Sequence, residues 1–266
     1  ESADGTMLTP SGAAAVSLAI MTVVSAGSHL LMVDSAYQPT RKLCDQLLSD
    51  YNVETEYYDP LIGGDIANLI RDNTAMIFME SPGSQTFEVQ DVPAIVAAAQ
   101  KAGVKTAIDN TWATPLNFRP LDFGVDFSIL AATKYVVGHA DALLGTVAAK
   151  GENFTKLERV HGNIGFSVGP DDVFLALRGL RTMPTRMKQH QQAALNIAAW
   201  LEGMNFVRKV FYPALPSAPG HDLWQRDFTG ASGLFSVELN PCSEEQLASM
   251  LDNMRLFGMG YSWGGF

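Results

Sequence analysis

Two side chains that could cooperate in covalent chemistry stand at the ends of neighbouring predicted strands. Lys134 follows the apolar run 126–130, and Asp109 ends the run 105–109. A lysine held in a semi-apolar loop loses basicity and can attack a carbonyl carbon. A carboxylate at the next strand end could keep a pyridine nitrogen protonated. Together they are the minimal protein apparatus for pyridoxal 5'-phosphate (PLP).

Both residues also have structural explanations. Most lysines that follow strands are simply solvated. Asp109 would serve equally well as a helix N-cap or a turn residue. The two residues alone therefore leave a cofactor site and an ordinary surface loop both open.

Other polar residues follow other predicted strands. They are Asp34, Ser35 and Tyr37 after the first strand, Glu80 and Ser81 after the third, Asn110 beside Asp109, and Thr133 beside Lys134. Ligands of open α/β sheets bind beyond the carboxyl ends of the strands. We therefore expect these groups to converge on one edge of the sheet.

Several common site signatures are missing from the sequence. It contains no glycine-rich dinucleotide or P-loop motif and no H-E-x-x-H. The five histidines are scattered without the spacing of metal ligands. We expect no metal site.

The elements that must position these residues alternate between strands and helices. The predicted strands are 29–33, 53–58, 75–80, 105–109, 126–130 and 142–149, and the helices among them are 12–25, 39–51, 64–72 and 92–102. Repeated β–α–β units with continuous apolar strands predict an α/β fold, a mostly parallel sheet flanked by helices.

The pattern changes after residue 152. Helices are predicted at 156–161, 170–181 and 184–204, then strands at 206–210 and 233–239 and a helix at 243–254. We expect a large domain over residues 1–205 and the start of a smaller α/β domain over 206–266. The chain lacks an initial Met and a polar tail, so we expect an internal piece of a longer protein, truncated in its C-terminal domain.

Composition excludes several classes of protein. Hydrophobic residues make up 47% of the 266, enough for a large core, which excludes disorder as the main state. The net charge of −10 argues against a nucleic-acid partner or an anionic membrane. The apolar stretch 12–24 is shorter than the roughly 20 residues of a membrane span.

The cysteine content indicates a compartment. Cys44 and Cys242 are the only two cysteines, and they form no disulfide framework. We therefore expect a reducing compartment, most simply the cytoplasm.

Many segments in order resemble one known family. They are S-G-A-A-A-V (11–16), A-Y-Q-P-T (36–40), Y-D-P-L-I-G (58–63), M-E-S-P-G-S (79–84), D-V-P-A-I-V-A (91–97), I-D-N-T-W-A (108–113), A-A-T-K-Y-V-V-G-H (131–139), R-G-L-R-T (178–182), Y-P-A-L-P (212–216), D-F-T-G-A-S-G-L-F (227–235) and G-Y-S-W-G-G (260–265). The sequence resembles the cysteine/methionine-metabolism family of PLP-dependent enzymes, which implies the fold of PLP-dependent transferases (fold type I).

The resemblance implies roles for single residues. Lys134 matches the lysine that binds PLP covalently and Asp109 the acid that bonds its ring nitrogen. The others are Tyr37, which stacks on the ring and takes part in catalysis, Gly12, Ala13 and Thr133, which bind the phosphate, and Ser262 and Trp263, which lie beside the substrate. Many relatives carry serine where this chain has Ala131, which removes one expected phosphate contact. Trp263 could instead be a core aromatic, and Trp112 could either wall the pocket or only support it.

The resemblance also implies an activity. Gly83 and the segment 261–265 are closest to members that cleave the Cβ–S bond of L-cystathionine, an amino-acid thioether, in methionine biosynthesis. A γ-lyase or γ-synthase activity and a non-catalytic PLP-binding fragment remain alternatives. The family implies a homotetramer, built as a dimer of dimers in which the subunits of each dimer share active sites. Its N-terminal Tyr-x-Arg pair and its late substrate-binding arginine are missing here, so we expect these 266 residues alone to turn over poorly.

Overall fold

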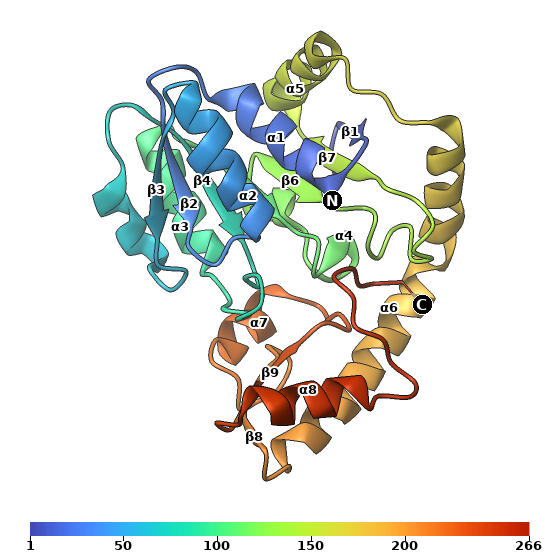
Figure 1. Ribbon diagram of the computed structural model, residues 1–266. Helices are drawn as coiled ribbons and strands as arrows, with labels where there is room; N and C mark the ends of the chain where they lie inside the picture. The colour runs from blue at the N-terminus through green and yellow to red at the C-terminus, as the bar shows by residue number, and fades with distance from the viewer. Residues whose placement is uncertain (266) are drawn as a thin grey trace.

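The computed structural model describes residues 1–265 and contains a seven-stranded sheet at its centre (Figure 1). The strand order is β1-β7-β6-β5-β4-β2-β3. The strands are β1 (Gly5–Thr9), β2 (His29–Val33), β3 (Glu54–Tyr58), β4 (Thr74–Glu80), β5 (Lys105–Asp109), β6 (Phe127–Leu130) and β7 (Gly145–Ala149). The block from β3 to β6 is parallel, and only the pairings of β7 with β6 and β1 are antiparallel. The predicted mostly parallel α/β sheet is confirmed.

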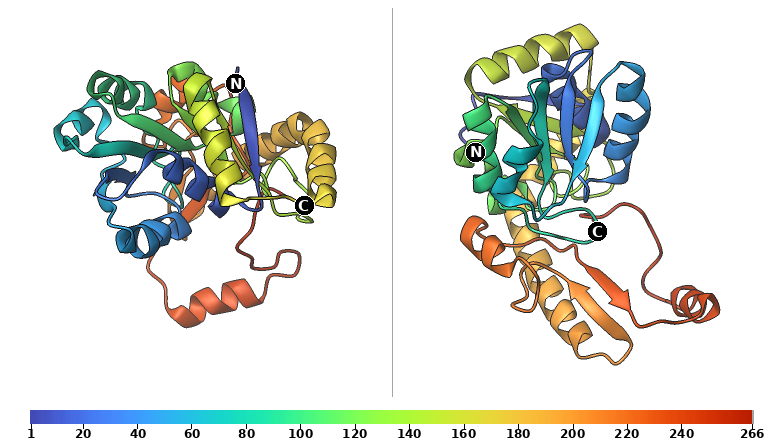
Figure 2. Two further views of the ribbon diagram at one scale, coloured as in Figure 1. Left: turned by 90° about the horizontal axis from the view of Figure 1, so that it is seen from above. Right: turned by 90° about the vertical axis from the view of Figure 1, so that its left-hand side faces the viewer.

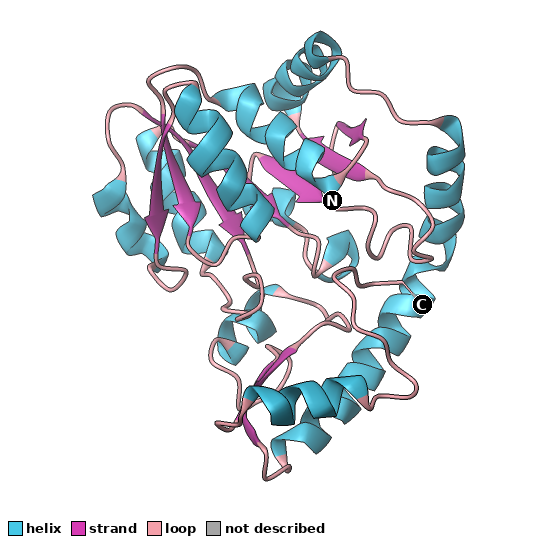
Figure 3. Ribbon diagram, viewed as in Figure 1, coloured by secondary structure: helices cyan, strands magenta, loops and turns pink. Residues whose placement is uncertain are grey.

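Helices cover both faces of this sheet, as the secondary-structure colouring shows (Figure 3). The first part of the chain contains α1 (Gly12–Val23), α2 (Gln38–Lys42), η1 (Leu43–Leu48), η2 (Gly63–Leu69), α3 (Val92–Ala102), α4 (Thr114–Asn117), η3 (Pro120–Phe123) and α5 (Gly151–Ile164). Helices α2 and α3 lie on opposite sides of the strands (Figure 2). Because both faces are covered, every residue of β2 is buried.

The long helix α6 (Pro170–Glu202) corrects the prediction of two separate helices. Pro184 lies inside it and cannot donate to the carbonyl four residues before. The helix changes direction along its length but continues (Figure 1), because Met183 and Met187 on either side of the proline are buried. Packing of the flanking turns outweighs the missing hydrogen bond.

Other differences lie at element ends. Strand β1 was not predicted, because it is a five-residue edge strand that begins with a glycine, and its pairing with β7 identifies it. Helix α5 begins at Gly151, five residues before the predicted start. The predicted strand 233–239 begins at Ser236.

The last part of the chain contains a second, two-stranded sheet. It consists of β8 (Val207–Phe211) and β9 (Ser236–Leu239) with α7 (His221–Asp227) and α8 (Glu244–Asp252). Tyr212 and Phe228 belong to the same buried cluster as the seven-stranded sheet, so this part packs directly on the sheet domain. The domain boundary at residues 205/206 stays a prediction, and residue 266 lies outside the described residues. Within residues 1–265, every helix is too short or too polar to cross a lipid bilayer.

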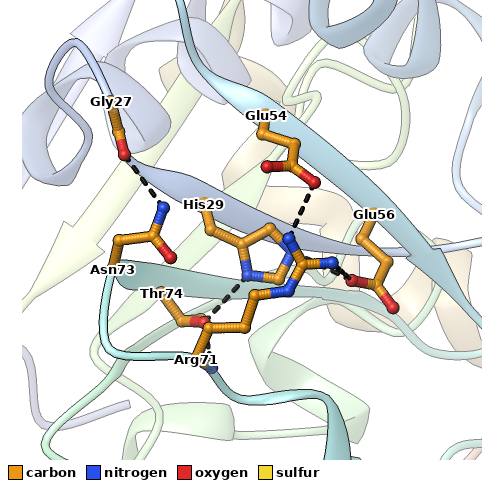
Figure 4. A network of polar contacts seen from close by, with 7 residues as sticks. All are labelled: Gly27, His29, Glu54, Glu56, Arg71, Asn73 and Thr74. Carbon is orange, nitrogen blue, oxygen red and sulfur yellow. Dashed lines mark hydrogen bonds and ion pairs between the residues drawn. The ribbon is translucent and has the colours of Figure 1, made fainter.

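A polar network joins the amino ends of β2, β3 and β4, opposite the edge where a ligand is expected (Figure 4). The buried His29 ring contacts Thr74 through Nδ1 at 2.8 Å, and its Nε2 lies 3.2 Å from Glu56. Arg71 binds both Glu54 and Glu56. Burial lowers the pKa of His29, the positive charge of Arg71 lowers it further, and the two glutamates oppose both.

This network predicts acid-sensitive stability. Because the folded protein holds His29 with a lowered pKa, the unfolded chain binds more protons below about pH 6.5, and stability falls as the pH drops through that range. In urea titrations between about pH 7 and about pH 5, we expect His29→Gln to flatten this loss. An identical pH slope for the variant and the parent protein would rule out His29 as the source.

Candidate active site

Two adjoining cavities open at the carboxyl ends of β4, β5 and β6. Their volumes are about 470 and 310 Å³, within the range of small-molecule sites. Tyr37, Asp109, Ala131 and Lys134 line both. The two cavities therefore form one cleft with the predicted amine and acid on its shared wall.

Lys134 lies in the turn that follows β6. Its Nζ donates to Ser262 Oγ at 3.0 Å and stands 5.2 Å from the centre of the Trp263 ring. Burial lowers the pKa of Lys134, because a charged ammonium loses hydration there. A larger fraction of the amine is therefore neutral and able to attack a carbonyl or accept a proton.

Asp109 ends β5, and one of its oxygens is already bound. Oδ1 accepts from Thr111 N at 2.9 Å and from Thr111 Oγ1 at 2.5 Å. No donor to Oδ2 occurs in residues 1–265. Burial raises the pKa of Asp109, while the bonds from Thr111 lower it. The carboxyl is thus held in place with one oxygen available to a donor in the cleft.

A second acid stands beside Asp109 in the sheet. Glu80 is its register partner on β4, and its Oε2 accepts from the backbone N–H of Tyr37 at 2.7 Å. Burial raises the pKa of Glu80 well above its ordinary value, the charge of Asp109 adds to this, and the bond from Tyr37 opposes it. Tyr37 itself is 51% exposed over the cleft, as a residue that contacts a ligand would be.

The start of α1 forms the far end of the larger cavity. Ser11 is the N-cap, and its side chain accepts from Ala14 N at 3.1 Å. The N–H groups of Gly12 and Ala13 have no acceptor among residues 1–265. Free N–H groups and the helix dipole make such an end suited to an anion.

Gly12 is required for a close approach of backbones. A Cβ at this position would lie 2.5 Å from Ala131 Cβ and 3.0 Å from its Cα. The start of α1 therefore sits directly against the strand end that leads to Lys134.

Thr133 lines the same cavity but is already hydrogen-bonded. Its hydroxyl donates to Leu144 O at 3.2 Å and accepts from Leu144 N at 2.9 Å. A phosphate contact from this side chain would compete with the bond to Leu144 O.

The smaller cavity has aromatic walls. Trp112, Trp263 and Leu234 line it, and Trp112 Nε1 donates to Leu234 O at 2.9 Å. The bond joins the sheet edge to the segment before β9. Trp263 also contacts the ring of Tyr135, with centres 5.3 Å apart.

The structure does not bring every predicted residue to the cleft. Those lining it are Gly12, Ala13, Tyr37, Glu80, Asp109, Thr133, Lys134 and Trp263, with Ser262 bonded to the lysine. Asp34 and Ser35 line a separate cavity. Ser81 and Asn110 are buried and bond to Gln90 N and Phe118 O. The polar residues predicted to converge all follow the carboxyl ends of parallel strands, so convergence on one edge is correct, but these four do not line the cleft.

Sequence reasoning missed two kinds of site residue. Ser11 had a usable signal, because serine before an apolar helical run is a typical N-cap. Leu234 and Ser236 had none, because they come from far along the chain and reach the cleft only through packing.

The cleft suits pyridoxal phosphate. The free N–H groups of α1 fit a phosphate, the amine of Lys134 fits the aldehyde, and Asp109 Oδ2 can accept from the ring nitrogen. The apolar walls accommodate an aromatic ring.

The tight contact at Gly12 gives a stability prediction. Gly12→Ala forces a methyl group against Ala131, so we expect a loss of about 1–3 kcal/mol in the free energy of unfolding. Gly64 has nothing within 4 Å of a new Cβ, and Gly64→Ala should be neutral or stabilising by about 0.4–1 kcal/mol. Urea denaturation of both variants checks this, and equal effects would show that the approach at Gly12 is not tight.

Comparison with known proteins identifies the family. The model of the family described as "Cys/Met metabolism PLP-dependent enzyme" matches residues 1–266. Cystathionine beta-lyase MetC of Escherichia coli (strain K12) is 46% identical over 269 residues, which cover 100% of this chain and 68% of that protein. L-alanine/L-glutamate racemase of Wolbachia pipientis wMel is 45% identical over 260 residues, which cover 97% of this chain and 64% of that protein.

Solved structures agree with this assignment. A crystal structure of cystathionine gamma synthase from Xanthomonas oryzae pv. oryzae superimposes with a TM-score of 0.94 at 31% identity, covering 99% of this chain and 68% of that one. The predicted PLP-dependent transferase fold is confirmed. Since the family model spans the whole chain and the cleft fits the cofactor, this chain belongs to the Cys/Met metabolism family of PLP-dependent enzymes.

Proposed function

We propose that this chain carries the catalytic centre of a carbon–sulfur β-lyase. The enzyme would cleave L-cystathionine, with the uptake of one water molecule, into homocysteine, pyruvate and ammonia, in the transsulfuration branch of methionine biosynthesis. The observation that carries the proposal is the cleft shared by Lys134 and Asp109. The 46% identity to the E. coli protein named cystathionine beta-lyase favours this substrate.

The cofactor would be held at three points. Lys134 would bind its aldehyde, Asp109 would accept a hydrogen bond from its ring nitrogen, and the N–H groups of Gly12 and Ala13, with Thr133, would bind its phosphate. Tyr37, exposed over the cleft, packs on the ring. When bound, pyridoxal phosphate supplies an electron-withdrawing ring that stabilises negative charge on the substrate Cα.

The chain's own residues then handle protons. Lys134, whose pKa burial lowers, takes the Cα proton as a neutral amine. Asp109 keeps a proton on the ring nitrogen by accepting its hydrogen bond. Lys134 or Tyr37 returns a proton to the homocysteine sulfur as it leaves Cβ.

One feature of the cleft region supports cleavage at Cβ, and a second indicates where the substrate binds. Gly83 packs so closely that a Cβ there would lie 2.3 Å from Ser35 Oγ, so the bulkier residues of γ-type relatives do not fit without movement. Ser262 and Trp263 contact Lys134 Nζ. We propose that these two residues bind the carboxylate and side chain of the substrate.

Racemisation is a second candidate function. The Wolbachia relative named as an L-alanine/L-glutamate racemase is 45% identical, and removal of a Cα proton is the first step of both reactions. The same cleft could therefore return the proton to the other face of Cα without breaking a C–S bond.

We further propose a cytoplasmic homotetramer with a small-molecule substrate and no nucleic-acid or membrane partner. The family resemblance supports the assembly. The net charge of −10 repels polyanions, and the absence of a disulfide between Cys44 and Cys242 fits a reducing compartment.

The reaction products formed by the full-length protein decide between these activities. With L-cystathionine and added pyridoxal phosphate, we expect pyruvate and homocysteine in stoichiometric amounts. Lys134→Ala should abolish turnover, whereas Lys101→Ala, an exposed lysine of α3, should not change it. Release of 2-oxobutyrate and cysteine would identify a γ-lyase. Formation of D-alanine from L-alanine without a keto acid would identify a racemase, and bound cofactor without any product would identify a non-catalytic protein.

Asp109 gives a separate prediction. Asp109→Asn removes the anionic acceptor of the ring nitrogen, so we expect kcat to fall by about two to three orders of magnitude, the usual cost of losing one preorganised electrostatic partner. Asp72→Asn, at an exposed loop position, is the matched control. Steady-state pyruvate release measures both, and a kcat for Asp109→Asn within threefold of the parent's, roughly 0.6 kcal/mol, would remove Asp109 from this role.

A further inference from the structure

Arg186 on α6 binds backbone carbonyls instead of a carboxylate. Its Nη2 donates to Gly179 O at 2.7 Å and to Val136 O at 3.4 Å, and its Nε donates to Thr182 Oγ1 at 3.0 Å. Among residues 1–265 it has no ion pair, and its Nη1 is buried without a hydrogen bond. This guanidinium thus joins α6 to the loop that begins at Lys134.

A half-buried cation without a counter-charge is costly to keep. Burial lowers the pKa of Arg186, and no carboxylate opposes that effect. An apolar side chain of similar length would fill the space at lower cost. What it could not do is donate to carbonyls of two different segments, as Nη2 does to Gly179 O on α6 and to Val136 O in the loop.

Two glycines make room for this contact. Gly138 has φ +68°, and a Cβ there would lie 2.1 Å from Nη1 of Arg186. A Cβ at Gly179 would lie 2.0 Å from Val137 O. Helix α6 and the loop therefore meet with almost no space between their backbones, and Arg186 closes the junction.

The loop held in this way is a single hydrogen-bonded turn that starts at the lysine. Gly138 N donates to Lys134 O at 2.8 Å, and Val137 N donates to Ala132 O at 2.9 Å. Any displacement of residues 136–138 therefore moves the backbone of Lys134. In the other direction, Lys134 Nζ reaches Ser262 inside the cleft.

We propose that Arg186 is a positioning residue, whose Nη2 joins the turn 134–138 to α6 as a clamp and so holds the Lys134 amine in the cleft. The proposal rests on the function proposed for Lys134, but not on which bond the enzyme cleaves. The middle of α6, which is far along the chain from the strand ends, thereby helps to hold the Lys134 amine in place.

Hydrogen exchange of the full-length protein without cofactor tests the clamp directly. In Arg186→Met we expect the amides of Val137 and Gly138 to exchange about tenfold faster or more, the factor that loss of one charge-assisted hydrogen bond produces. Peptides of β2 should exchange at the parent rate. Arg186→Lys keeps the charge but has one nitrogen in place of the separate donors Nε and Nη2, so its exchange rate should lie between those of Arg186→Met and the parent. Arg181→Met, exposed on the same helix, should match the parent.

A second readout connects the clamp to Lys134. The rate at which pyridoxal phosphate and a hydride donor label Lys134 should fall about tenfold in Arg186→Met, in step with the faster exchange. Parent-like exchange of the turn in Arg186→Met would overturn the proposal, and so would slower labelling with unchanged exchange. If Arg186→Met does not fold, Arg186→Lys is tested in its place. Faster amide exchange in the whole protein, rather than in the turn 134–138 alone, would then overturn the proposal. Failure of the proposed function is recognised separately, because the parent protein would then carry no label on Lys134.

Discussion

The chemistry of this site depends on the removal of water from the Lys134 amine and the Asp109 carboxyl group, which lie on the shared wall of the cleft. Burial lowers the pKa of Lys134 and raises that of Asp109, so each group is held away from its preferred charge. A ligand with an aldehyde for the amine and a basic ring nitrogen for the acid relieves both costs at once. Pyridoxal phosphate is such a ligand, so its binding free energy would include relief of these two desolvation costs.

The fold supplies this arrangement through ordinary features of parallel sheets. Strands β5 and β6 are neighbours in register, so the residues after them meet at one edge. Helix α1 starts at the same edge, where Gly12 allows it to touch Ala131, and its free N–H groups face the place of an anion. The second part of the chain closes the cleft through the bond from Trp112 to Leu234 O. Each of these contacts uses backbone geometry, which explains why glycine and the helix start matter as much as the reactive side chains.

The sequence predicted the parts of the site that local pattern determines. Apolar runs placed β2, β4 and β5 within a residue, and the polar residues after them pointed to Tyr37, Glu80 and Asp109. It could not predict β1, which is identified by its pairing with β7, or the continuation of α6 through Pro184, which buried methionines support. Ser81 and Asn110 follow the same pattern as their neighbours, yet they turn into the core to satisfy Gln90 and Phe118. Local pattern gives the edge of a sheet, whereas the direction of each side chain there depends on contacts formed across the chain.

Reductive labelling with pyridoxal phosphate tests whether Lys134 is the residue that binds the cofactor. The full-length protein is incubated with pyridoxal phosphate, reduced with hydride, digested, and its modified peptide is identified by mass spectrometry. The account predicts a pyridoxyl group on Lys134 and no label in Lys134→Ala. Lys42 also lines the larger cavity, so a label on Lys42 or on any other lysine, with Lys134 unmodified, would contradict the account.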